Sequence, residues 1–149
     1  MARQRDVGVK PRVARQAVAV GELRPRPTTR KAIRSHRVEK GDPLSAGELA
    51  GLLAMKRTSE LIPHCHAVPL TASSVDLSLS RRGVRVRAEA STVDRTGVEM
   101  EALVGASVAL LTVWDMVKYL EKDARGLYPA TSLGPVRVLT KVKSRQEVG

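Results

Sequence analysis

Acidic and basic side chains interrupt one long apolar stretch, Thr96–Leu120 (TGVEMEALVGASVALLTVWDMVKYL). Its acids are Glu99, Glu101 and Asp115, and Lys118 follows Asp115 by about one helical turn. A carboxylate among apolar residues loses hydration unless it finds a partner, and groups in that position often have shifted pKa values and transfer protons. These side chains are therefore candidate acids and bases. The alternative is that Asp115 and Lys118 form an ordinary surface ion pair.

The same stretch predicts a helix, because Thr96 and Glu99 have the spacing of a capping box and the residues after them are nearly all small or apolar. Glu101 and Asp115 are close to four whole turns apart, so they point in a similar direction but lie about 21 Å apart along the axis. One small molecule cannot touch both. A shared site therefore needs a break in the helix or a second copy of the chain, as in a symmetric dimer.

A second group of reactive side chains is His64-Cys65-His66. In an extended segment His64 and His66 face the same way, and His36 is conceivable as a third metal ligand. We expect no metal site, because no further cysteine or carboxylate has the spacing of a closed site. A histidine that contacts substrate and one that is merely packed or exposed in a loop remain alternatives. Cys65, the only cysteine, excludes an intrachain disulfide, is consistent with the cytoplasm, and is more typical of a small buried side chain than of a nucleophile.

Alternating and helical patterns predict the elements that position these groups. We expect strands at Asp6–Lys10, Arg12–Val20, Ser73–Leu79, Val84–Val93 and Pro135–Val142, and further helices at Thr28–Arg37 and Leu44–Thr58. This order predicts one α+β domain over residues 1–149, with helices on one face of a largely antiparallel sheet. Residues 1–5 and 144–149 are expected to be flexible.

Positive charge is concentrated at the N-terminus. The net charge is +11, and residues 1–40 hold 12 of the 26 Lys and Arg but only three acids. Such a segment can hold phosphates, attract nucleic acid or be a solvated arm. Nucleic acid is disfavoured by the shortage of stacking groups, since the chain has one Trp, two Tyr and no Phe. No signal peptide and no apolar run as long as a membrane span is visible, which predicts a cytoplasmic protein without membrane contact.

Several longer motifs resemble the MoaC family, the cyclic pyranopterin monophosphate synthases of molybdenum cofactor biosynthesis. They are KGDPL at Lys40–Leu44, AMKRTSELIPHCHAVPLT at Ala54–Thr71, TGVEMEAL at Thr96–Leu103, WDMVK at Trp114–Lys118 and GPVRVLTK at Gly134–Lys141. The similarity runs in one order from about Asp6 to Lys141, and several long motifs in register are a specific signal.

This resemblance implies a lyase. Enzymes of the family convert a cyclised dihydroguanosine triphosphate, (8S)-3',8-cyclo-7,8-dihydroguanosine 5'-triphosphate, to cyclic pyranopterin monophosphate and pyrophosphate. The family fold is ferredoxin-like, and the expected assembly is a hexamer, a trimer of dimers, with active sites at subunit interfaces. No cofactor is firmly implied, and Mg²⁺ accompanying the triphosphate is left open.

Matching motif positions imply a role for each candidate residue. Asp115 would be the catalytic acid or base, Lys118 its proton-transfer partner and Lys40 a further catalytic group. The implied substrate-binding residues are His64, Cys65, His66, Glu99, Met100, Glu101, Arg15 and Lys141.

The chain departs from the family pattern after Lys141. A glycine-rich loop of the form KSGGKSG is usual there, whereas this chain continues Val142-Lys143-Ser144-Arg145. His64 also replaces an apolar residue, and Ala67 stands where proline is common. A catalytically weakened paralogue that binds nucleotides or serves assembly is therefore the alternative function, and a basic nucleic-acid-binding module is a third.

Overall fold

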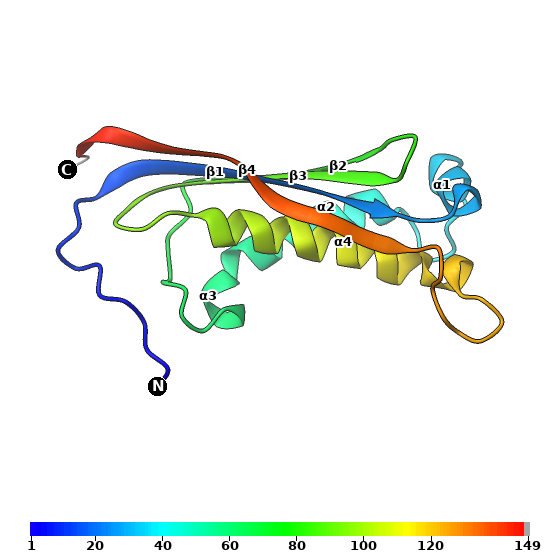
Figure 1. Cartoon of the computed structure of the whole chain (residues 1–149). Helices are drawn as coiled ribbons and strands as arrows, with labels where there is room; N and C mark the ends of the chain where they lie inside the picture. Colours follow the sequence, from blue (N-terminus) through cyan, green and yellow to red (C-terminus); the bar gives the residue numbers. More distant parts are fainter. Residues whose placement is uncertain (148–149) are drawn as a thin grey trace.

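The computed structural model describes residues 1–147 and shows one antiparallel sheet with helices packed on one of its faces (Figure 1). The elements in chain order are β1 (Val13–Arg24), α1 (Pro27–Arg34), α2 (Pro43–Lys56), α3 (Thr58–Leu61), β2 (Ala72–Leu79), β3 (Val84–Asp94), α4 (Glu99–Glu121) and β4 (Ser132–Glu147). This arrangement confirms the predicted α+β class and is consistent with a ferredoxin-like fold.

The sheet has the strand order β2-β3-β1-β4, and every neighbouring pair is antiparallel. Because side chains alternate between the two faces of a strand, each strand has an apolar side and a polar side. On the helix side β1 and β3 place fully buried alanines, among them Ala19 and Ala88. On the other side β3 places Arg85, Arg87 and Glu89. The small residues let α4 lie close against the centre of the sheet.

Glycines bring α2 and α4 into close contact. A Cβ atom on Gly51 of α2 would lie 2.7 Å from the carbonyl oxygen of Gly105 in α4, and one on Gly47 would lie 2.9 Å from the carbonyl oxygen of Ala109. By length and hydropathy alone α4 could cross a membrane, but half of its most apolar window is buried within the fold. The helix therefore has the surroundings of a core helix.

The C-terminal end of α4 is fixed by the buried carboxylate of Glu121. It accepts hydrogen bonds from the backbone N–H of Arg26 (2.9 Å), from the hydroxyl of Thr131 (2.7 Å) and from the hydroxyl of Thr29. Arg26 is the N-cap residue of α1 and makes no side-chain cap itself. The Glu121 carboxylate therefore satisfies the start of α1 from another helix and ties the two elements together.

Two local predictions are wrong. Asp6–Lys10 is a turn rather than a strand: the N–H of Lys10 donates to the carbonyl of Val7, and the Asp6 carboxylate accepts from the N–H of Gly8. The segment has no partner strand, and alternation alone does not make a ladder. The capping box is also absent, because α4 begins after Val98 without a side-chain cap.

The last strand and a short helix also differ from the sequence prediction. β4 extends to Glu147, which pairs with Val13, so it runs through part of the tail that was expected to be flexible. Residues 148–149 lie outside the described residues. The helix α3 was not predicted, and it closes the turn between α2 and the histidine segment.

Candidate functional site

Two lysines flank the carboxylate of Asp115 near the C-terminal end of α4. The Nζ atom of Lys118 lies 2.7 Å from Oδ1, and the Nζ atom of Lys40 lies 3.4 Å from Oδ2 and donates to the Asp115 backbone carbonyl at 3.1 Å. Hydrogen bonds from Lys118 and then from Lys40 lower the pKa of Asp115. The same carboxylate raises the pKa of Lys118. We call these three residues the Asp115 cluster. Its side chains are exposed to solvent and therefore accessible to a ligand.

Tertiary contacts bring Lys40 to this cluster from the loop between α1 and α2. Asp42 accepts from the N–H of Leu44 and thereby caps α2, which fixes the C-terminal side of the loop. The hydroxyl of Tyr119 accepts a hydrogen bond from the backbone N–H of Glu39 at 2.7 Å. Sequence reasoning missed Tyr119, although its position one turn after the candidate aspartate on α4 was a signal for it.

Glu101 lies at the opposite end of α4 and is almost completely buried, with 2% of its surface exposed. The Sγ atom of Cys65 lies 3.8 Å from its Oε1 atom, and its Oε2 atom has no hydrogen-bond partner among the described residues. Burial, together with the nearby charge of Glu99, raises the pKa of Glu101. Burial and then Glu101 raise the pKa of Cys65. Both groups therefore tend to hold their protons. We call Glu101, Cys65 and the nearby Glu99 the Glu101 cluster.

Other residues of the predicted set surround Glu101. Lys141 of β4 forms an ion pair with Glu99, and although burial opposes it, this pairing lowers the pKa of Glu99. The capping box is missing because Val98 is the N-cap residue, which makes Glu99 the first residue of the helix and leaves Thr96 outside the cap position. Met100 is exposed to solvent on the first turn of α4.

Arg15 is held by backbone groups of the loop that leads into α4. Its Nε atom donates to the carbonyl of Asp94 and its Nη2 atom to the carbonyl of Arg95, each at 3.1 Å. These bonds position the loop and the start of the helix, so the structure gives Arg15 a structural contact at this end of the site.

The two histidines contact the N-terminal segment. Nδ1 of His64 lies 2.5 Å from the carbonyl oxygen of Arg3, and Nε2 of His66 lies 2.6 Å from that of Arg5. His36 lies apart from them, in a turn after α1 with a φ of 54°. Within residues 1–147 no three His, Cys, Asp or Glu side chains gather in a metal-binding group.

The structure does not bring the two clusters together within one chain. The helix α4 is continuous from Glu99 to Glu121, so Glu101 and Asp115 remain about 21 Å apart along its axis. A break in the helix is thus excluded as a way to join them. Of the two arrangements derived from the sequence for joining the clusters, only a second copy of the chain remains.

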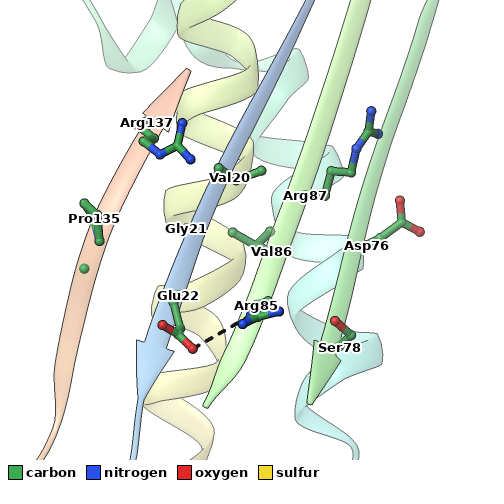
Figure 2. A pocket seen from close by; sticks show the side chains of 11 residues that line it. Val20, Gly21, Glu22, Asp76, Ser78, Arg85, Val86, Arg87, Pro135 and Arg137 are labelled. Carbon is green, nitrogen blue, oxygen red and sulfur yellow. Dashed lines mark ion pairs between the residues drawn. The ribbon is translucent and has the colours of Figure 1, made fainter. Parts of the chain in front are cut away.

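A separate pocket of about 680 Å³ lies on the other face of the sheet (Figure 2). Its charged side chains come from neighbouring strands: Glu22 of β1, Arg85 and Arg87 of β3, Asp76 of β2 and Arg137 of β4. None of the predicted site residues lines it, and sequence reasoning did not find it, because strand order alone brings these residues together.

Comparison with known proteins agrees with the resemblance in the sequence. The model of the MoaC family matches residues 4–144. A protein of Archaeoglobus fulgidus named "Probable cyclic pyranopterin monophosphate synthase" is 49% identical, over 95% of this chain and 91% of the relative. Proteins with the same name from Pyrococcus furiosus and Methanosarcina acetivorans are 45% and 49% identical, each over 95% of this chain and 90% of the relative.

Proposed function

Because the chain belongs to the MoaC family, we propose that it is a lyase of molybdenum cofactor biosynthesis, a cyclic pyranopterin monophosphate synthase. Its substrate is a cyclised dihydroguanosine triphosphate, and its products are cyclic pyranopterin monophosphate and pyrophosphate. The observation that carries the proposal is the Asp115 cluster, in which one ionised carboxylate lies between two ammonium groups. The relatives extend over nearly the whole chain, so the comparison covers both clusters.

The protonation states divide the chemical roles. The two lysines keep Asp115 ionised, so it is the group that can accept a proton, and Lys118 and Lys40 can donate protons and stabilise negative charge. At the other end of the helix burial raises the pKa of Glu101 and of Cys65, which favours their protonated forms, and in that form each can donate a hydrogen bond to the substrate. Rearrangement of a ring needs proton donors and acceptors on both sides, which this division provides.

The proposal includes a homodimer in which each site uses two chains. A two-fold axis near the middle of α4 would place Glu101 of one chain beside the partner's Asp115. Leucines with about half of their surface exposed support such an interface: Leu49 and Leu53 on α2 and Leu111 on α4. The trimer of such dimers and the cytoplasmic location remain parts of the proposal. Mg²⁺ would enter bound to the triphosphate, as is common for nucleotide substrates.

The test of the roles is pyrophosphate release from the cyclised nucleotide. We expect turnover by the unaltered protein and a loss of about 10²-fold or more in Asp115→Ala and Lys118→Ala, since general acid–base catalysis contributes that much. Lys122→Ala, an exposed lysine one turn further on, is the matched control and should retain activity. Turnover that persists in both cluster variants would refute the roles.

The alternatives give different results in the same experiments. A weakened paralogue binds the nucleotide tightly without releasing pyrophosphate. A nucleic-acid-binding module shows affinity for strands that falls steeply with salt, by about one unit of log–log slope for each phosphate contacted.

Mixing two inactive variants tests the shared site. Asp115→Ala and Glu101→Ala chains, exchanged after mild dissociation, form mixed dimers in which one of two sites is intact. We expect recovery of about one quarter of the unaltered activity, because half of the dimers are mixed and half of their sites are restored. Absence of recovery, with chain exchange verified, would contradict the two-chain site.

A further inference from the structure

Residues 3–5 lie beside residues 64–66 in a constant register. Arg3 contacts His64 and Arg5 contacts His66 through their backbone carbonyls, and the amide of Gln4 donates to the carbonyl of Cys65 at 3.0 Å. The members of each pair are 61 positions apart, so the two segments run side by side in the same direction. Figure 1 shows the N-terminal trace descending beside the loop that follows α3. We call residues 3–5 the strap.

The strap fixes the orientation of both histidine rings. A carbonyl oxygen only accepts, so the ring nitrogen of His64 and that of His66 must each carry a hydrogen and donate it. Gln4 holds the backbone of Cys65, whose thiol contacts Glu101. The strap is therefore two contacts away from the buried carboxyl at the start of α4.

The strap carries positively charged side chains at this end of the site that are not engaged by other described groups. Arg15 uses its guanidinium on loop carbonyls, and Lys141 is paired with Glu99, so neither is available without breaking a bond. Arg3 and Arg5 are exposed, and no described carboxylate pairs with either guanidinium group. A guanidinium fork matches phosphate oxygens in two-point contacts.

We propose that the strap is a polyphosphate-binding element, in which Gln4 and the two histidines hold the segment in place while Arg3 and Arg5 bind the phosphates of the nucleotide. This inference rests on the proposed function for the identity of the nucleotide. It adds a binding role for a segment that the sequence analysis assigned to a flexible end.

The test compares two pairs of neutralised arginines. Arg3→Gln/Arg5→Gln alters the strap, and Arg34→Gln/Arg81→Gln removes the same charge from exposed positions elsewhere. Binding of GTP, inorganic triphosphate and guanosine is measured calorimetrically at fixed ionic strength. We expect the strap pair to weaken binding of GTP and of triphosphate about 10- to 100-fold, as loss of one or two charge-assisted contacts would, with guanosine binding unchanged. The control pair should leave all three affinities within about twofold.

Gln4→Ala provides a second variant that retains both charges. If the strap is held as described, this change loosens it, so trypsin cleaves after Arg5 faster than in the unaltered protein and triphosphate binding weakens. Equal affinities in the strap pair and the unaltered protein would overturn the proposal, as would an equal loss in the control pair or no binding of triphosphate by the unaltered protein. Pyrophosphate release is scored separately: its absence refutes the proposed function, while the strap is judged on these affinities alone.

Discussion

Replacing Glu101 by glutamine should stabilise the protein while impairing its function. The side chain is 2% exposed, its Oε2 atom has no described partner, and burial raises its pKa. A carboxyl with a raised pKa in the folded state binds its proton more tightly there than in the unfolded chain. Stability is therefore fully present below the unfolded pKa of about 4.3 and is lost as the pH rises through the folded pKa.

The magnitude follows from the buried charge. Leaving a buried group without a partner costs about 1–3 kcal/mol when it is neutral and more when it is charged, so Glu101→Gln, which removes the charge with little change of shape, should recover about 1–3 kcal/mol. We expect the variant to be more stable at pH 8 by about that amount, which corresponds to a rise in Tm of about 2–12 °C for a chain of this size. The advantage should shrink toward pH 4.5, where the unaltered carboxyl is protonated.

The assay is thermal unfolding followed by circular dichroism between pH 4.5 and 8, with pyrophosphate release measured on the same samples. Glu60→Gln is the matched control, because Glu60 is an exposed carboxylate and the chemical change is identical. We expect the control to show neither the pH-dependent gain in Tm nor the loss of turnover. A Glu101→Gln protein that is less stable at pH 8, or a difference that does not vary with pH, would show that the carboxylate is satisfied in the protein and would refute the reasoning.

Three further predictions concern the elements that support the site. Glu121→Ala leaves two buried hydroxyls and one half-buried backbone N–H without their acceptor and should lower the free energy of unfolding by about 3–5 kcal/mol, as measured by urea titration. Gly51→Ala should destabilise by about 1–3 kcal/mol in the same assay, less the helix-propensity gain of about 1 kcal/mol, because its Cβ would press on a backbone carbonyl; Gly134→Ala, with open space around it, is the control. Tyr119→Phe removes the acceptor that holds the loop carrying the candidate lysine, so kcat should fall by about tenfold with little change in KM.

The sequence by itself determined the fold class, the family and the distance between the two clusters. The α4 region was predicted within a few residues, because its apolar character extends over many turns and does not depend on distant contacts. The same regular geometry sets the distance of about 21 Å between Glu101 and Asp115 along the helix axis. Long motifs in one order identified the family, and the comparisons confirmed it.

Only the tertiary structure decided which side chains meet. Lys40 reaches Asp115 from 75 positions away, and Cys65 reaches Glu101 from 36 positions away. The strap and the hydrogen bonds from Arg15 to loop carbonyls likewise could not be predicted from the sequence. Periodicity reports which face of an element is apolar, but contacts between distant segments depend on strand order, on loop closure and on competition between partners, and these are set only when the whole chain packs.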